Sequence, residues 1–219
     1  MAGLVEEGPA VAGFEVEFEG AGALVAVPDV LRAMEVVPRE EFLPHRLRDL
    51  GSRNIALPIA CGQMMPPPVS LALMFEALAA RPEDRVLEIG TGTGYATAVL
   101  ARLVREVVSF ERYRTLATEA EGRLQRLGIA AHVVVGDGLE FPAQFGRFDK
   151  ILVHAALDAV PRSLEEALAA DGRIVAGALA SEGRPAAIAV FERAGDTFAC
   201  RRLSAMRLPA VRRGVALAL

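Results

Sequence analysis

The sequence predicts an α/β fold with a doubly wound, mostly parallel sheet. From residue 85 onward, short stretches rich in Val, Ile and Leu alternate with stretches of helical spacing, the order expected of a parallel sheet covered on both faces. A glycine-rich turn joins the first of these strands to the helix that follows it. Near the C-terminus only a turn at Gly195 separates two expected strands, which predicts an antiparallel hairpin. The expected architecture is therefore a Rossmann-like sheet that ends in an antiparallel hairpin.

The N-terminal region carries the elements expected to precede this sheet. Residues 14–18 alternate apolar and acidic side chains and predict a short edge strand or hairpin. The stretch 28–42 predicts an amphipathic docking helix that Pro38 ends. Residues 54–68 hold several prolines and predict a loop, and loops of this length often carry function. A helix over 69–78 is expected to follow that loop.

The remaining elements follow the βα alternation and then the hairpin. They are a strand at 85–89, a helix to about Val104, a strand at 106–110, a helix at 114–127, strands at 132–135 and 149–153, a helix at 161–169, and strands at 173–176, 186–192 and 197–203. We expect one compact unit with two parts: residues 1–80 form N-terminal docking helices and a substrate loop, and residues 81–219 form the α/β domain.

Composition excludes several classes of protein. A chain of 219 residues with 53% hydrophobic residues is long enough to bury a conventional core as one domain. The net charge of −4 argues against a broadly basic nucleic-acid-binding face. Arginines between 201 and 213 make the C-terminal part basic, and we interpret them as a solvated surface or as contacts with the acidic N-terminal region.

Cysteine spacing and the hydrophobic pattern bear on location. Cys61 and Cys200 lie far apart, with no CxxC motif and no clustered histidines, so we expect neither a metal site nor a disulfide framework. The first residues are acidic where a signal peptide is basic, and no apolar run approaches the roughly 18 residues of a membrane span. We therefore expect a cytoplasmic protein without a membrane partner.

The glycine-rich turn is the strongest functional motif. Gly90, Gly92 and Gly94 follow the strand at 85–89 and open the next helix. Glycines accept positive φ and present bare N–H groups, so a nucleoside or a carboxylate can approach the backbone closely. A dinucleotide fingerprint starting at Gly90 needs glycine or alanine at position 95, where Tyr95 stands. A phosphate-binding P-loop is also disfavoured, because no Gly-Lys-Ser/Thr follows.

Two acidic residues follow the next strands. Glu111 lies 111 − 90 = 21 residues beyond the first glycine, about the spacing at which an acid accepts hydrogen bonds from ribose hydroxyls. The alternative is an ordinary solvated charge. Asp137 stands between Gly136 and Gly138, where it can accept from an adenine amino group or simply form a tight turn.

Together these residues resemble the class I S-adenosylmethionine-dependent methyltransferases, whose first motif is an acid, one residue and then G-x-G-x-G. Glu88 to Gly94 match that motif. The resemblance implies S-adenosylmethionine as cofactor, S-adenosylhomocysteine as product and the class I methyltransferase fold. By the same resemblance, Glu88 helps to hold the methionine end, the turn of Gly90, Thr91, Gly92 and Gly94 lies under the cofactor, Glu111 takes the ribose, and Asp137 with Gly138 takes the adenine side.

Residues from about 27 to 177 resemble the protein-L-isoaspartate (D-aspartate) O-methyltransferase family. The matching segments occur in order: Ala33-Met34, Val37 to Pro44, Ala56 to Ile59, Gly62-Gln63, Glu88 to Tyr95, Gly136 to Gly138, Phe148-Asp149, Ala155-Ala156 and Pro161. In that family the methyl group passes to the free α-carboxylate of an isoaspartyl residue, and the ester then closes to a succinimide that reopens partly to aspartate. The implied partner is a peptide or protein that carries such a carboxylate.

The acceptor loop departs from the family pattern. In the family, a loop of the form G-Q-T-I-S-x-P carries hydroxyls that orient the acceptor carboxylate. Here Met64 stands in place of the Thr and Pro66 in place of the Ser, so both hydroxyls are absent. Gln63 keeps its amide and could bind the backbone of a peptide acceptor. Met64 and Met65 either pack under the loop or form the wall of a more apolar acceptor pocket.

His154 follows the expected strand at 149–153, at the edge where open α/β sheets bind ligands. It could hydrogen-bond the acceptor carboxylate or act as a base, and the alternative is a structural histidine. We therefore expect Gln63, Met64, Pro66 and His154 on the acceptor side of the site. Two other functions stay open: a methyltransferase of this fold with a different carboxylate or peptide acceptor, and a non-catalytic protein that binds S-adenosylmethionine.

Overall fold

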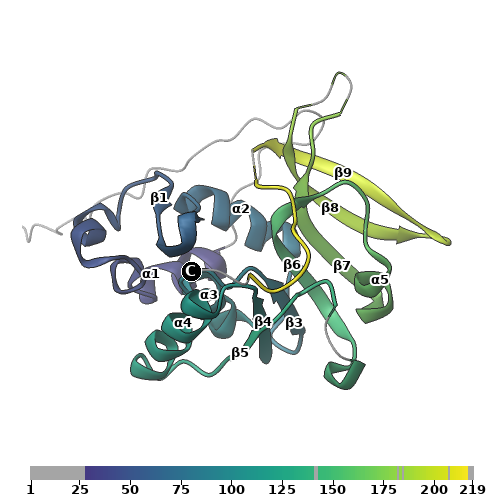
Figure 1. Ribbon diagram of the computed structural model, residues 1–219. Coiled ribbons are helices and arrows are strands. Elements are labelled where there is room, and N and C mark those ends of the chain that lie inside the picture. The colour runs from purple at the N-terminus through teal and green to yellow at the C-terminus, as the bar shows by residue number, and fades with distance from the viewer. Residues whose placement is uncertain (1–27, 141–142, 182, 184, 207, 217–219) are drawn as a thin grey trace, which may run out of the picture.

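The computed structural model describes residues 28–140, 143–181, 183, 185–206 and 208–216. Its centre is a seven-stranded sheet of order β5-β4-β3-β6-β7-β8-β9 (Figure 1). The first five strands in this order run parallel, and β8 and β9 are added antiparallel. The predicted fold, a mostly parallel sheet with a C-terminal antiparallel hairpin, is confirmed.

The elements lie close to the predicted ones. The strands of the large sheet are β3 (Arg85–Ile89), β4 (Glu106–Glu111), β5 (His132–Val135), β6 (Phe148–Leu157), β7 (Leu168–Ala178), β8 (Ala187–Ala194) and β9 (Thr197–Ala205). The helices are α1 (Pro28–Val36), α2 (Pro68–Leu78), α3 (Tyr95–Leu103), α4 (Arg114–Arg126) and α5 (Arg162–Ala167), with short 3-10 helices η1 (Arg39–Phe42), η2 (His45–Leu50), η3 (Ala60–Gly62) and η4 (Ala143–Phe145). The strand or hairpin predicted over 14–18 lies outside the described residues.

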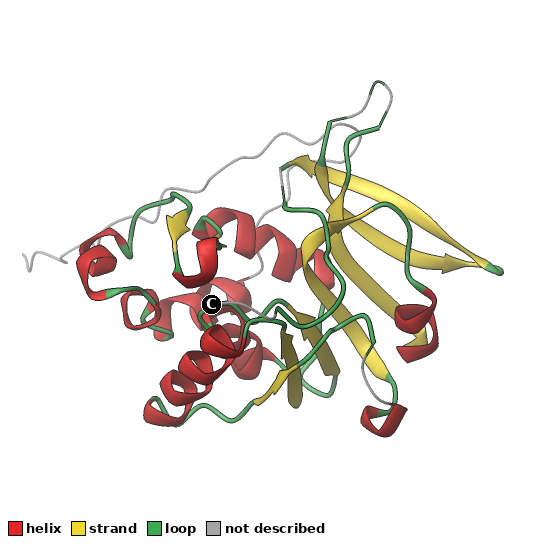
Figure 2. Cartoon of the chain, viewed as in Figure 1, coloured by secondary structure: helices red, strands yellow, loops and turns green. Residues whose placement is uncertain are grey.

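Both faces of the sheet are buried, as the sequence predicts. Val86 belongs to one core cluster and Leu87 to the other, because successive side chains of a strand point to opposite faces. Helices α1 to α4 contribute to the first cluster, and α5 contributes Leu164 to the second. In Figure 2 most of the helices lie on the left and in the centre of the view, whereas β8 and β9 lie on the right, where α5 packs beside β7.

Two predictions about local structure were wrong. The loop predicted over 54–68 contains a small antiparallel pair, β1 (Leu57–Pro58) and β2 (Met64–Met65), which we call the acceptor hairpin. The strand predicted to stop at Val153 continues to Leu157 because β6 pairs again with β7 beyond a register shift. His154 therefore lies inside β6 and not after it.

The topology places a ligand edge at the carboxyl ends of β3 and β6. The chain adds β4 and β5 on one side of β3, and then returns to add β6 and β7 on the other. Open α/β sheets bind ligands where the strand order reverses in this way.

Among the described residues, the structure has no helix long and apolar enough to span a bilayer.

Candidate functional site

A cavity of about 760 Å³ opens at this edge of the sheet. Its size lies within the range of about 300 to 1,000 Å³ that is usual for small-molecule sites. The lining includes the glycine turn after β3, the ends of β4 and β5, part of β6, the acceptor hairpin, and the C-terminal residues Met206 and 208–212. The predicted cofactor motif and the predicted acceptor loop therefore face the same cavity.

The glycine turn has a backbone that only glycine adopts without strain. Gly90, Gly92 and Gly94 have φ of 98°, 56° and 92°. A Cβ on Gly90 would lie 3.2 Å from the Cβ of His154 on β6. The Gly90 N–H donates to the carbonyl of Phe110 on β4 at 2.8 Å, which ties the turn to the neighbouring strand. Gly90, Thr91 and Gly92 line the cavity, so it has a wall with bare backbone, as predicted.

Glu111 ends β4, and its carboxylate is anchored to the backbone. One oxygen, Oε2, accepts the N–H of Gly92 at 2.8 Å, and Oε1 accepts the N–H of Tyr113 at 3.0 Å. The residue is only 4% exposed, and it still lines the cavity. Burial raises the pKa of Glu111, and the N–H groups that donate to it offset part of that rise. Each carboxylate oxygen keeps a second lone pair, so the group can still accept from two ligand hydroxyls.

Asp137 and Gly138 form a turn after β5 and also line the cavity. Oδ1 of Asp137 accepts the Leu139 N–H at 2.9 Å, and Oδ2 accepts the N–H of Gly214. A Cβ on Gly138 would lie 2.7 Å from Cγ2 of Ile89, so a larger residue does not fit there. The tight-turn interpretation of Asp137 is thus confirmed by geometry, and its role toward adenine stays a prediction.

Glu88 is completely buried and lies outside the cavity lining. Its Oε2 accepts hydroxyl hydrogens from Thr97 at 2.5 Å and from Ser109 at 2.6 Å, and its Oε1 lies 2.9 Å from Nε2 of His154. The Thr91 hydroxyl lies 2.6 Å from that of Ser109. Glu88 therefore connects the glycine turn, β4 and β6 beneath the cavity.

His154 lines the cavity from β6. Its Nε2 lies 2.9 Å from Oε1 of Glu88, so this nitrogen makes the contact with the buried carboxyl group. Its other nitrogen, Nδ1, is buried and has no hydrogen-bond partner among the described residues. The ring is thus fixed by the carboxylate beneath it, which favours a role in shaping the site over a role as a freely moving base.

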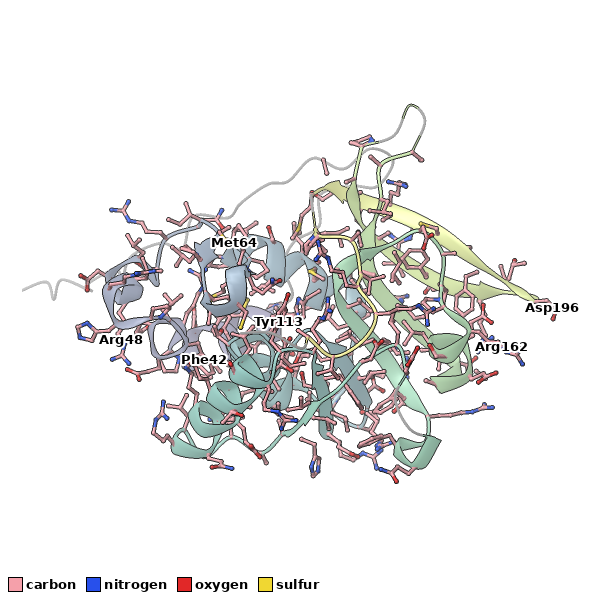
Figure 3. All side chains as sticks on the ribbon, viewed as in Figure 1. Phe42, Arg48, Met64, Tyr113, Arg162 and Asp196 are labelled. Atoms are coloured by element: carbon pink, nitrogen blue, oxygen red, sulfur yellow. The ribbon has the colours of Figure 1, made fainter. Side chains whose placement is uncertain are left out.

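Both methionines of the acceptor hairpin line the cavity, and they differ in burial. Met65 is also packed in the core, whereas Met64 is 53% exposed. Gln63 donates from Nε2 to the Cys61 carbonyl at 3.0 Å and lies 3.4 Å from the Tyr113 hydroxyl. Figure 3 shows Met64 on the hairpin and Tyr113 just beyond β4, the two segments that this contact joins.

Arg39 holds the acceptor loop in place, a role that sequence reasoning missed. The residue is 5% exposed, and burial lowers its pKa. Its guanidinium donates to four backbone carbonyls, those of Gly51 at 2.9 Å, Arg53 at 3.2 Å, Ile55 at 3.2 Å and Pro66 at 3.1 Å. The only sequence signal was that Arg39 lies in a segment that matches the resembled family.

Residues 208–216, which we call the C-terminal strap, were also missed as part of the site. The strap crosses the carboxyl ends of the sheet and is the yellow segment in front of β6 in Figure 1. Ala156 of β6 donates to the Pro209 carbonyl at 2.7 Å and accepts the Val211 N–H at 3.0 Å. At the other end of the strap, the N–H of Ala216 donates to the Arg112 carbonyl at 3.0 Å. The strap therefore spans the cavity and closes one side of it.

Comparison with known families and sequences gives a consistent result. Residues 17–211 match the family model described as Protein-L-isoaspartate(D-aspartate) O-methyltransferase (PCMT). A protein-L-isoaspartate O-methyltransferase 2 of Rhodopseudomonas palustris (strain HaA2) is 46% identical over 188 residues, which cover 85% of this chain and 86% of that protein. A protein-L-isoaspartate O-methyltransferase of Caulobacter vibrioides (strain NA1000 / CB15N) is 44% identical over 153 residues, 69% of each chain.

Solved structures agree with this result. A structure named protein-L-isoaspartate O-methyltransferase superposes with a TM-score of 0.76 at 27% identity, and the match covers 87% of this chain and 63% of that one. A putative protein-L-isoaspartate O-methyltransferase from Plasmodium falciparum, in complex with S-adenosyl-L-homocysteine, gives a TM-score of 0.73 at 19% identity, covering 87% and 93% of the two chains. The second match supports the fold alone.

Proposed function

Because the chain belongs to the protein-L-isoaspartate(D-aspartate) O-methyltransferase family, we propose that it transfers a methyl group from S-adenosylmethionine to the α-carboxylate of an isoaspartyl residue. The observation that carries this proposal is the shared cavity, in which the glycine turn and Glu111 face the acceptor hairpin. A cofactor on the first wall and a peptide carboxylate on the second would meet inside it.

The residues of the cofactor side fit a nucleoside. The glycine turn brings the backbone of Gly90 and Gly92 to the cavity, and the anchored carboxylate of Glu111 offers free lone pairs to ribose hydroxyls. Asp137 and Gly138 form the cavity wall where the adenine would lie. Glu88 lies beneath this wall and acts through the residues that it holds, including His154.

Methyl transfer asks the protein mainly to position two groups. When bound, S-adenosylmethionine supplies a methyl group on a positively charged sulfur, which makes the methyl carbon electrophilic. The acceptor carboxylate is already a nucleophile, so no general base is needed and His154 is not required to remove a proton. The hairpin must instead hold the carboxylate in line with the methyl group. Arg39 serves that purpose by holding Pro66 in the loop through backbone contact.

Methylation of an isoaspartyl peptide beside its normal aspartyl twin tests the proposal. With methyl-labelled cofactor, we expect label to enter the isoaspartyl peptide and not the twin, and to be released as the ester closes to a succinimide. Equal labelling of both peptides would mean that the hairpin does not select the isoaspartyl geometry. Cofactor binding without transfer to either peptide would contradict the proposed reaction.

A second acceptor class is favoured by one observation. Met64 presents an exposed apolar side chain to the cavity, and Pro66 offers no hydroxyl. A methyltransferase that acts on another carboxylate or peptide with an apolar neighbour would use such a wall. A panel of carboxylate peptides with apolar and polar flanking residues distinguishes this function from isoaspartyl transfer. A non-catalytic binding protein would bind the cofactor and label no member of the panel.

We further propose how the chain divides its work and where it acts. Residues 1–80 hold the acceptor, and residues 81–219 bind the cofactor; the acceptor hairpin from the first part and the glycine turn from the second line the same cavity, which supports this division. The partner is a peptide or protein with a free isoaspartyl carboxylate. We also place the protein in the cytoplasm, a compartment that keeps cysteines such as Cys61 reduced.

A further inference from the structure

The charged side chains that line the cavity differ in what they already contact. Glu111 and Asp137 accept backbone N–H groups at the side where we place the nucleoside. Arg112 directs Nη2 to the carbonyl of Arg213 at 3.4 Å, and its guanidinium lies 5.4 Å from the ring centroid of Tyr113. These three cavity residues are therefore engaged within the protein.

Arg212 is the exception among the charged residues of the cavity. It lines the cavity from the C-terminal strap and is exposed. Its guanidinium has neither a hydrogen bond nor an ion pair with any of the described residues. A free guanidinium on a ligand cavity has five donors in a planar fork, which matches the two oxygens of a carboxylate.

We propose that Arg212 binds a carboxylate inside this cavity. The inference rests on the proposed function, since the reaction brings two such groups to the site: the methionine carboxylate of the cofactor and the carboxylate of the acceptor. The acceptor hairpin gives the second group no side-chain hydroxyl, because its loop presents Met64 and Pro66. The Arg212 guanidinium, which lines the same cavity, supplies the donors that this loop lacks.

The strap fixes where the Arg212 backbone lies. On one side, the preceding residue, Val211, donates to the Ala156 carbonyl on β6. On the other side, the N–H of Gly214 donates to Asp137 in the turn after β5. In the sheet order, β3 and β4 lie between these two anchors. The strap therefore carries Arg212 across the strand ends that bear the glycine turn and Glu111.

The neighbouring residue gives a matched control. Arg213 is also an exposed arginine of the strap, but it does not line the cavity, and its guanidinium lies 3.5 Å from the carboxylate of Glu140. Arg212→Met and Arg213→Met remove the same charge from adjacent positions. A difference between them reports contact within the cavity, and a shared change reports only the net charge of the protein.

Three binding measurements on the full chain test the proposal without requiring turnover. Calorimetry gives the Kd of S-adenosylhomocysteine and of 5′-methylthioadenosine, which lacks the amino-acid end. A third titration gives the Kd of an isoaspartyl peptide for the complex with S-adenosylhomocysteine. We expect Arg212→Met to raise the Kd of S-adenosylhomocysteine or of the isoaspartyl peptide by about tenfold or more. The Kd of 5′-methylthioadenosine should stay within about twofold of the wild-type value. Arg213→Met should leave all three nearly unchanged.

The titration that changes in Arg212→Met shows whether Arg212 binds the carboxylate of the cofactor or that of the acceptor. A weaker S-adenosylhomocysteine complex assigns Arg212 to the cofactor, and weaker peptide binding alone assigns it to the acceptor. Arg212→Lys should recover part of the loss, because it keeps the charge but not the planar fork. Unchanged binding in Arg212→Met, equal losses in Arg213→Met, or an equal loss for 5′-methylthioadenosine would each overturn the proposal.

Failure of this inference is distinct from failure of the proposed function. If wild-type protein binds S-adenosylhomocysteine and methylates the isoaspartyl peptide while Arg212→Met behaves like wild type, the reaction stands and the role of Arg212 falls. If wild-type protein binds none of the three ligands, the proposed function falls and the inference falls with it.

Discussion

The two walls of the cavity are built in different ways. On the cofactor wall, Glu111 accepts hydrogen bonds from backbone N–H groups, and all three glycines of the glycine turn have positive φ. Beneath this wall, the buried Glu88 accepts hydrogen bonds from side-chain hydroxyls. On the acceptor wall, the side chain of Met64 is exposed, and the carbonyl of Pro66 is held by Arg39. The first wall depends on particular side chains, and the second depends on backbone position.

This difference indicates where substitutions are tolerated. Replacing a residue of the cofactor wall leaves hydrogen-bond donors without a partner. An unpaired buried polar group costs about 1 to 3 kcal/mol. Replacing the side chains at positions 64 and 66 leaves the hydrogen bond from Arg39 in place, because Arg39 contacts the Pro66 carbonyl and not a side chain. The acceptor wall can therefore lose its hydroxyls while the loop keeps its conformation.

Glu111→Ala should have the largest effect on binding. It removes the charged acceptor of the ribose hydroxyls and leaves the N–H groups of Gly92 and Tyr113 without their partner. We expect S-adenosylhomocysteine affinity to fall about 100-fold, which corresponds to roughly 3 kcal/mol. Calorimetry measures this, with Glu140→Ala as the control because Glu140 is exposed and lies outside the cavity lining. Equal affinity in Glu111→Ala and wild type would remove Glu111 from the cofactor site.

Arg39→Met should affect the acceptor wall and spare the cofactor wall. It deprives four loop carbonyls of their donor, so we expect a loss of about 3 kcal/mol in the free energy of unfolding, measured in urea. KM for the isoaspartyl peptide should rise, while the Kd of S-adenosylhomocysteine changes little. Arg39→Lys should recover only part of the stability, because an ammonium group has three donors. A rise in the Kd of S-adenosylhomocysteine as large as the rise in KM would contradict the separation of the two walls.

Glu88→Gln tests the buried hydrogen bonds beneath the cofactor wall. The amide introduces hydrogen-bond donors at a position where the Thr97 and Ser109 hydroxyls already donate and where His154 is in contact. We expect the free energy of unfolding to fall by about 2 kcal/mol, and Ser109→Ala to cost less, about 1 kcal/mol, because it removes one of these bonds. Chemical denaturation of both variants checks the order. Stability equal to wild type in Glu88→Gln would mean that the carboxylate is not the acceptor at the centre of these contacts.

The pH dependence of cofactor binding should give the smallest effect. Burial raises the pKa of Glu111, so its carboxylate takes up a proton at a higher pH than an ordinary glutamate does. If the ionised form accepts the ribose hydroxyls, affinity falls as pH decreases, by about twofold at that pKa and by at most about tenfold per pH unit below it. Glu111→Gln should bind S-adenosylhomocysteine more weakly than wild type does, and its affinity should not change with pH over the same pH range. A parallel decline in both proteins would assign the pH dependence to another group.

The sequence predicted local features of this molecule better than distant ones. The strands at 85–89 and 132–135 have the predicted bounds, because a short apolar run between turn residues is a local pattern. The glycine turn was found because its three glycines form a short motif, and Glu111 was found because its separation from Gly90 matches a known spacing. Arg39 escaped prediction because its partners lie 12 to 27 residues away and are carbonyls, which leave no mark in the sequence.

Tertiary contacts also explain the errors about His154 and the C-terminal strap. The sequence predicted that His154 follows the end of a strand. In the structure, β6 pairs again with β7 at Ala156, so the strand continues beyond His154. The strap reaches the site through Ala156 and Asp137, and Asp137 lies 77 residues from Gly214. Neither pairing follows from periodicity, because both depend on how the finished sheet brings distant segments together.

The double change Met64→Thr with Pro66→Ser tests the central claim most directly, because it restores hydroxyls on the acceptor wall and leaves the cofactor wall intact. Both kcat/KM for an isoaspartyl peptide and the Kd of S-adenosylhomocysteine are measured on the same protein. We predict that kcat/KM rises about tenfold, equivalent to roughly 1.4 kcal/mol, and that Kd stays within about twofold. A fall in kcat/KM from a robust wild-type value would contradict the account, since it would show that the methionine and proline loop is itself adapted to the acceptor.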